Sequence, residues 1–401
     1  MNRRRLLCAG VAIGVASLSA GCFGGDGEDE PDDENESGDE NESTNGDENA
    51  GFEAMPRVED PPEAVYLPTH RDGTIMLETR TAGELAISPM LSIPHFFWLM
   101  PGPERVDPPA TDAVHLMVAI WDPETEVVIP IDSGLTIELA KDGTPIITRS
   151  PWPMLSQGMG FHFGDNYEID GNGRYTATVT VNPMSDVRLT GEFAGRFDER
   201  TSATVEFELD EETRRELVDR IERFDEGRWG SRDAVPPMGD RHGEGESSDR
   251  DESGDHERGG GHEMPYSSVP PVEALPGRLL GEPTHDDAVY ATTLLSPGSR
   301  FVDGDEYYLA VSSRTPYNRC VLPQQALSAR VARGDETIAE TTLRETLDHE
   351  LHYHYGAPIA DLRAGDQVVV SVETPSQAAR HQGYETAFRS PGELTFELEE
   401  V

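Results

Sequence analysis

Short runs in which apolar and polar residues alternate are the feature that most restricts how this chain folds. Tyr175–Val181 and Gln367–Val372 place apolar side chains at alternate positions, and His115–Ile120 is a further apolar run. Turn signals such as Asp142-Gly143 separate runs of this kind. A period of two is typical of strands that bury one face. The sequence therefore predicts an all-β chain built from β-sandwiches.

Changes in composition divide the chain into five parts. Two stretches are acidic, rich in glycine and poor in apolar residues, which is typical of solvated segments that do not fold. A short helix is expected where the capping residue Asp210 is followed by Leu217 and Ile221 at helical spacing. The predicted parts are a signal peptide at 1–22, an acidic disordered tether at 23–55, a β-sandwich with a short C-terminal helix at 56–225, a disordered acidic linker at 226–275 and a second β-sandwich at 276–401.

The two predicted sandwiches are related to each other as repeats. When the sequence is aligned with itself, His162 meets His354 and Gly164 meets Gly356. Pro183 and Pro375 match at the same spacing. Self-similarity at a fixed spacing indicates a tandem duplication of one fold.

The N-terminus has the pattern of an export signal. Arg3–Arg5 precede an apolar stretch, Leu6–Leu18, and a small-residue motif ends at Cys22. The arginines resemble a twin-arginine (Tat) signal, and Ser19–Cys22 resembles a lipobox in which Cys22 is lipidated after cleavage. A single-pass helix is the weaker alternative, because about 16 apolar residues fall short of the ~20 that span a bilayer. We expect an exported lipoprotein anchored to the outer face of the cell membrane.

Charge narrows the classes of partner. The chain has 77 acidic and 32 basic residues, a net charge of −45. It lacks the basic face that binds phosphates, so nucleic-acid binding is not expected. The composition resembles that of halophilic archaeal proteins, whose charged surfaces keep them soluble in high salt.

Catalytic motifs are absent from the sequence. We find no Gly-x-Ser-x-Gly elbow, no Walker loop, no Gly-x-Gly-x-x-Gly fingerprint and no His-Glu-x-x-His helix. Only Cys320 remains beside Cys22 after cleavage, so no disulfide within the folded regions is expected either. The sequence therefore predicts a protein that is not an enzyme.

Residues with soft donor atoms gather in the first sandwich. His115 and Met117 share one face of an extended run, and Met154 precedes His162, which lies between two phenylalanines that point to the opposite face. If these strands are neighbours, two imidazoles and two thioethers converge. That donor set favours copper or another late transition metal. The alternative is structural, because methionine commonly fills gaps in apolar cores.

The same residues resemble the periplasmic P19-type iron-transport accessory family. The resemblance rests on His115 and Met117 within a strand, on Met154, and on the Gly-Phe-His-Phe-Gly-Asp-Asn segment that contains His162. It implies immunoglobulin-like sandwiches that bind copper and other divalent metals through these four residues, in paired sites at a dimer interface. Two positions depart from the family: Met117 stands where it has glutamate, and Leu189 where it has a late third histidine.

The second sandwich contains another candidate ligand set. His352 and His354 share a strand face, and His381 aligns with Leu189 of the first sandwich. Two histidines on one face and a third from a neighbouring strand form a set suited to copper or zinc. An exposed polar edge is the alternative. His95 lies in an aromatic segment and is expected to pack there.

These observations lead to one preferred function and one alternative. We expect an extracytoplasmic, lipid-anchored protein that binds copper or iron, with zinc as a further candidate, and that handles the metal or assists iron uptake. A membrane permease is its expected partner. The alternative is a metal-free cell-surface β-sandwich module for protein–protein interaction. The two differ in whether the donor atoms of His115, Met154 and His162 approach one shared point.

Overall fold

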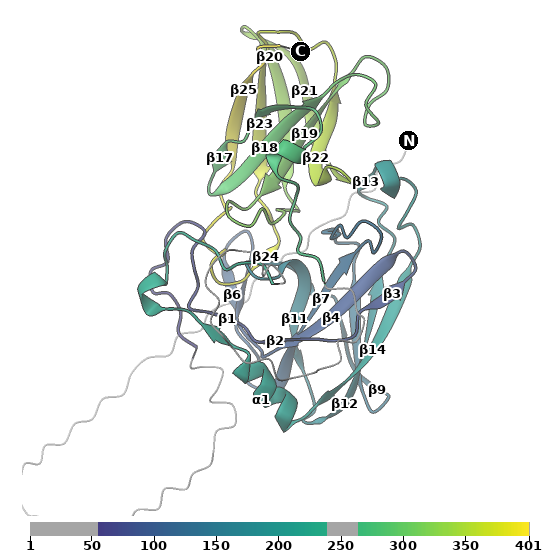
Figure 1. The fold of residues 1–401 in the computed structure, drawn as a ribbon, viewed down its shortest axis with the longest axis vertical. Helices are drawn as coiled ribbons and strands as arrows, with labels where there is room; N and C mark the ends of the chain where they lie inside the picture. Colours follow the sequence, from purple (N-terminus) through teal and green to yellow (C-terminus); the bar gives the residue numbers. More distant parts are fainter. Residues whose placement is uncertain (1–54, 239–263, 401) are drawn as a thin grey trace, which may run out of the picture. The chain divides into compact units, whose positions relative to one another are not determined.

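The computed structural model describes residues 55–238 and 264–400. The predicted signal peptide with Cys22, all but the last residue of the predicted tether and the middle of the predicted linker lie outside these ranges. Over the described ranges the chain is mostly β, with several sheets and one α-helix (Figure 1). The prediction of a β-rich chain is confirmed.

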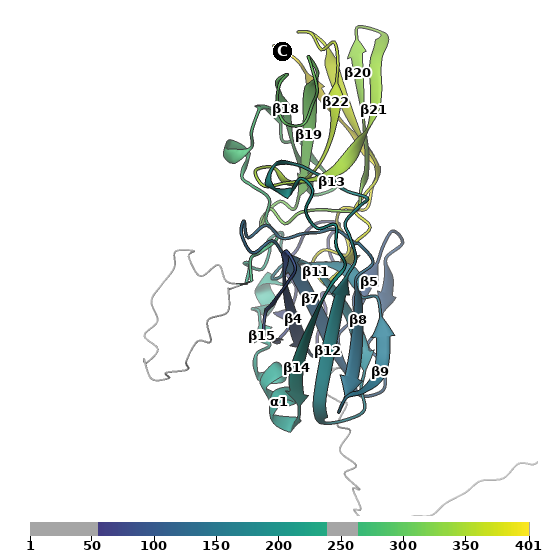
Figure 2. The same ribbon diagram turned by 90° about the vertical axis from the view of Figure 1, so that its right-hand side faces the viewer.

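Two sheets make up most of the first half. The larger has nine strands in the order β2 (Thr74–Met76), β4 (Leu85–Ser92), β7 (Ala113–Trp121), β11 (Gly160–Glu168), β10 (Trp152–Ser156), β24 (Ala379–Arg380), β5 (Phe97–Leu99) and β6 (Glu104–Val106), with β3 (Arg80–Ala82) paired to β4. The smaller sheet has the order β14 (Thr201–Leu209), β12 (Gly173–Val181), β8 (Thr136–Lys141) and β9 (Thr144–Arg149), and these strands lie side by side in Figure 2. A separate pair joins β1 (His70–Arg71) to β15 (Glu222–Arg223).

The two sheets of the first half enclose an apolar core. Along β14, Val205 and Phe207 are buried and Glu206 between them is exposed, as the alternating pattern predicts. Phe207 belongs to the same buried cluster as Leu116 of β7. The other face of β7 carries His115 and Met117 and is buried as well. Further parts of the chain must therefore cover that face, and the candidate site lies beneath them.

The second half is built on one sheet. Its path is β16 (Arg278–Gly281), β18 (Ala288–Leu295), β19 (Tyr307–Arg314), β22 (His352–Ile359), β21 (Glu336–Asp348), β20 (Ala326–Arg333), β23 (Gln367–Thr374) and β25 (Gly392–Glu397), with β13 (Arg188–Leu189) paired to β21 and β17 (Thr284–His285) to β18. The terminal strands β16 and β25 approach each other. The eight strands of the path therefore form a nearly closed barrel, which corrects the prediction of a second β-sandwich.

Strand β21 explains why this half is nearly closed and not divided into two sheets. Its first part pairs with β20 and its last part with β22, without interruption. In the first half the corresponding stretch is divided into β9 and β10, and Pro151 lies between them. Proline lacks the N–H that a sheet ladder requires. The strand is interrupted at Pro151, and its two parts, β9 and β10, belong to different sheets of the first half.

The predicted helix is present but shorter than its sequence pattern. Helix α1 spans Glu211–Asp219, and the Asp210 carboxylate accepts a hydrogen bond from the backbone N–H of Thr213 at 2.8 Å. The chain then turns into β15, which ends the helix. Three short 3-10 helices complete the elements: η1 (Gly191–Phe193), η2 (Glu226–Arg228) and η3 (Val272–Ala274).

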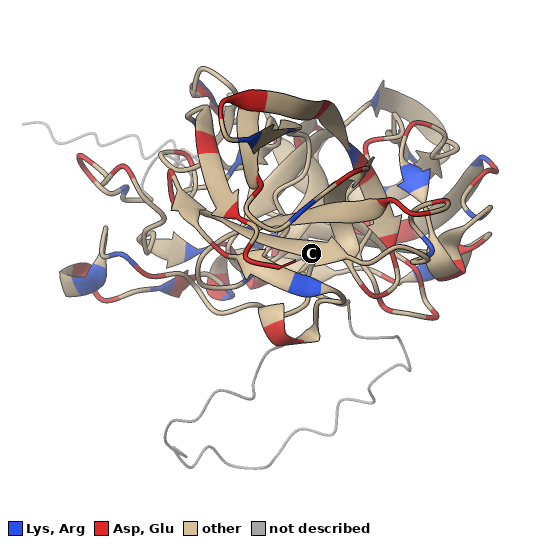
Figure 3. Cartoon of the chain, turned by 90° about the horizontal axis from the view of Figure 1, so that it is seen from above, with Lys and Arg blue, Asp and Glu red and all other residues tan. Residues whose placement is uncertain are grey.

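The described ends of the predicted linker are packed against the protein. Val235 and Val269 are each 2% exposed. Acidic residues occur on both strands and loops (Figure 3). Among the described residues, no helix has the length and hydropathy needed to cross a membrane.

Candidate metal centre

Strand register brings the predicted ligands of the first half onto one face of the large sheet. Strand β7 pairs with β11, and β11 pairs with β10. Met154 lies directly opposite His162, and Met117 lies directly opposite Gly164. Residues directly opposite each other in a sheet share a face. The strands that carry His115, Met154 and His162 are therefore neighbours, as the prediction requires.

Gly164 leaves a small space between two donor atoms. A Cβ at this position would lie 3.0 Å from His115 Nε2 and 3.1 Å from Met154 Sδ. The imidazole nitrogen and the thioether sulfur therefore border the same point. A side chain at Gly164 would force one of them to move.

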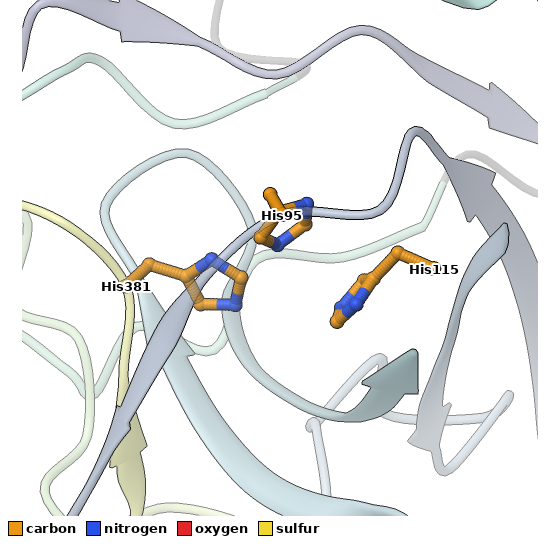
Figure 4. A group of neighbouring side chains, drawn as sticks. All are labelled: His95, His115 and His381. Carbon is orange, nitrogen blue, oxygen red and sulfur yellow. The ribbon is translucent and has the colours of Figure 1, made fainter. Parts of the chain in front are cut away.

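Three imidazoles meet at this face, each from a different segment of the chain (Figure 4). One ring nitrogen from each of His95, His115 and His381 lies within 4.8 Å of the other two. The ring centroids of His95 and His115 are 4.0 Å apart, and the ring of His162 lies 5.2 Å from that of His381. In residues 55–238 and 264–400 this is the one group of three or more histidine, cysteine or carboxylate ligands close enough to hold a metal ion.

All four imidazoles have a buried Nε2 atom without a hydrogen-bond partner. In three of them Nδ1 faces an oxygen: His95 with Ile93 O at 2.9 Å, His115 with Asn166 Oδ1 at 3.0 Å and His162 with Gly160 O at 3.2 Å. These oxygens accept hydrogen bonds, so Nδ1 carries the proton and Nε2 presents its lone pair. Leaving a buried polar group unsatisfied costs about 1–3 kcal/mol. The rings of His95, His115 and His381 come together here, and their unsatisfied lone pairs fit the ligand shell of a metal ion.

Burial keeps the rings of His115, His162 and His381 neutral. It lowers the pKa of His115 and His381 well below the ordinary range, and the nearby His95 lowers both further. Burial also lowers the pKa of His162, to about 4. Neutral imidazole is the form that binds metals. Near neutral pH, a metal ion therefore displaces no proton from these three rings.

His381 reaches this site because the two halves exchange short strands. Strand β24 pairs with β10 and β5 of the first half, and the backbone N–H of His381 donates to Leu155 O at 3.0 Å. In return, β13 of the first half pairs with β21 of the second. Leu189, which aligns with His381, therefore lies against the second half. The prediction that His381 completes a site in the second half is corrected accordingly.

His352 and His354 do not share a site with His381. His354 Nδ1 lies 3.0 Å from His352 O, and its Nε2 lies 3.1 Å from the Tyr308 hydroxyl. His352 Nδ1 lies 3.2 Å from Ser268 O. Both ring nitrogens of His354 therefore have hydrogen-bond partners, and in the described residues neither histidine belongs to a group of three ligands.

The second half repeats the register of the first with other side chains. The pair Met154–His162 of the first half corresponds to Thr346–His354 of the second. In the same way, Met117–Gly164 corresponds to Ala310–Gly356. Tyr308 takes the place of His115: its hydroxyl approaches Thr346 Oγ1 at 3.3 Å, and a Cβ on Gly356 would collide with it. A hydrogen-bonded cluster thus stands in the second half where the first has imidazole and thioether groups.

His95 is the ligand candidate that the sequence analysis missed. It was expected to pack against aromatic side chains, and its ring stands in the imidazole group instead. Asn166 Nδ2 donates to His95 O at 2.9 Å, and Asn166 Oδ1 faces His115 Nδ1. One amide therefore positions two of the three imidazoles. Nothing in the spacing of His95 along the chain predicts this contact.

A pocket adjoins the imidazole group. Its walls include His95, His381, Met117 and Asp72. The cavity volume is about 90 Å³, which has room for several water molecules. Burial raises the pKa of Asp72, but the neighbouring His95 and the hydrogen bond with His70 outweigh it, so that the pKa lies below its ordinary value. An ionised carboxylate therefore faces the pocket.

Comparison with known families covers part of the chain. Residues 273–397 match a family described as "Domain of unknown function (DUF7350)". The match spans strands β16 to β25 and includes His381, but it excludes His95 and His115. A search of curated proteins finds no match to the chain. The family match therefore supplies no function.

Proposed function

We propose that this chain binds a transition metal outside the cell and handles copper or iron there. The observation that carries this proposal is the set of four buried Nε2 atoms without partners, belonging to His95, His115, His162 and His381. These nitrogens are buried at the covered face of the large sheet, and no hydrogen-bond donor of the described residues contacts them. A metal ion would satisfy them.

The donor set favours a soft ion. His95, His115 and His381 would hold the metal, and Met154 Sδ borders the same space as His115 Nε2. Imidazole with thioether suits copper better than calcium or magnesium, which prefer oxygen. Copper is therefore our first choice, ahead of iron and zinc.

The resemblance to P19-type proteins supports the same function. Under this proposal the first half is an immunoglobulin-like sandwich, and the family's late histidine, missing at Leu189, is replaced by His381 from the second half. The family's dimer interface then has its counterpart within one chain, whose halves exchange β13 and β24. One of the two equivalent sites keeps its ligands, and the other has become a hydrogen-bonded cluster around Tyr308.

The sequence supports the location of this function. Export and lipidation at Cys22 would place the folded part on the outer face of the membrane, on the acidic tether. There it would bind its metal, exchange it with a membrane permease and catalyse no reaction.

Metal analysis of the full-length chain tests the proposal. The protein is exposed in high salt to Cu(I), Cu(II), Fe(II) or Zn(II), freed of excess ion, and its metal content is measured by mass spectrometry. We expect stoichiometric metal in the wild type and in His349→Ala, a control in the second half, and its loss in His115→Ala/His381→Ala. Absence of metal from the wild type, or equal content in the double variant, would refute the proposal.

A further inference from the structure

Methionine is concentrated around the imidazole group. All 11 methionines of the chain lie at or before position 264, and the second half has none. Four of them line the pocket that contains His95 and His381: Met55, Met117, Met159 and Met238. Thioether and imidazole side chains therefore line the same pocket.

The methionines also contact one another. Met90, Met117 and Met159 are at least nine-tenths buried and form one cluster, against which the partly buried Met238 and Met264 pack. The backbone N–H of Met238 donates to Gly158 O at 2.7 Å, which fixes Met238 beside the turn that carries Met159. At the inner end of the pocket, Met117 reaches the imidazoles. A Cβ added at Gly164 would lie 3.3 Å from Met117 Cγ and 3.0 Å from His115 Nε2. The thioethers thus extend from the partly exposed rim to the imidazoles.

The second half provides an internal control for packing. At the equivalent register positions it has Thr293 for Met90, Ala310 for Met117, Thr346 for Met154 and Leu351 for Met159. Its corresponding cluster packs leucine, alanine and aromatic side chains with no sulfur. The fold therefore does not require methionine at these positions. The half that lacks the imidazole group also lacks the thioethers, which associates the two sets with one function.

We propose that the methionine-lined pocket is a loading route for Cu(I), along which the thioethers of Met238, Met159 and Met117 bind the ion before the imidazoles do. This inference rests on the proposed metal-binding function. Thioether sulfur is a soft, uncharged ligand that selects Cu(I) over Zn(II) and Fe(II), whereas imidazole accepts all three. The route thus supplies a selectivity that the imidazoles lack.

Uptake kinetics test the loading route. Cu(I) is supplied without oxygen from a weak chelator to the full-length chain, and the rate of uptake is compared with that of Zn(II). The test variant is Met159→Leu/Met238→Leu, because leucine is close to methionine in volume and already occupies the equivalent position at Leu351. We expect the Cu(I) rate to fall by about tenfold and the Zn(II) rate to stay the same. Met184→Leu, in the main core, serves as the control and should change neither rate.

The outcomes separate this inference from the proposed function. An unchanged Cu(I) rate in the double variant overturns the loading route, while the imidazole site stands if His115→Ala/His381→Ala still removes bound Cu(I). Equal slowing of Cu(I) and Zn(II) also overturns it, because the change would then be structural. If the wild type takes up neither ion, the proposed function itself fails.

Discussion

The ring centroids of His95 and His381 lie 4.9 Å apart, although the two residues belong to different halves of the chain. Strand pairing produces this contact, since β24 is inserted between β10 and β5 of the large sheet. The imidazole group is therefore complete only when the segment that carries His381 is docked on the first half.

Removal of His381 tests this dependence. A ligand that binds only the folded state raises the free energy of unfolding, by about 2.7 kcal/mol when its concentration is 100 times its dissociation constant. His381→Ala weakens metal binding, so the stabilisation by added metal should largely disappear. Urea unfolding of both proteins with and without metal measures it. An increment as large as that of the wild type would show that His381 is not a ligand.

Asn166 should influence metal affinity without binding the metal. Its side chain faces His115 Nδ1 and donates to His95 O. Loss of a residue that orients metal ligands typically lowers affinity about 10–100-fold. We expect a decrease of that size in Asn166→Ala, measured by competition with a chelator of known affinity. Wild-type affinity in this variant would contradict the positioning role.

The two equivalent glycines should respond differently to substitution. In Gly164→Ala the new methyl group would press on His115 Nε2 and Met154 Sδ, so metal affinity should fall. In Gly356→Ala it would collide with the Tyr308 hydroxyl, so stability should fall by about 1–3 kcal/mol, with metal affinity unchanged. Metal titration and urea unfolding of both variants separate the effects. Equal metal affinity in the two variants would refute the assignment of the site to the first half.

The sequence predicted what depends on local pattern. Alternation predicted the strands and the shared face of His115 and Met117, and pairing of neighbouring strands then brought Met154 and His162 beside them. It did not predict the origin of His381, because an exchange of two-residue strands between repeats leaves no periodic signal. Nor did it predict His95, whose backbone is hydrogen-bonded to the Asn166 side chain, a contact between residues far apart in the sequence.

Stability should depend on pH through His354, which is outside the metal group. Burial lowers its pKa to about 4 from 6.5. Between these values the unfolded chain binds more protons than the folded one, so stability falls as the pH decreases from 6.5 towards 4. Lowering the pH from about 7.5 to about 5 should therefore destabilise the metal-free wild type by about 2 kcal/mol more than His354→Gln. Identical pH dependence in urea unfolding would refute this assignment.

X-ray absorption at the metal edge of the copper-loaded, full-length chain tests the central claim most directly. The account predicts the scattering pattern of imidazole ligands together with a sulfur neighbour, and a reduced imidazole contribution in His381→Ala. A spectrum without imidazole ligation, or one that His381→Ala leaves unchanged, would contradict the assignment of the metal to this site.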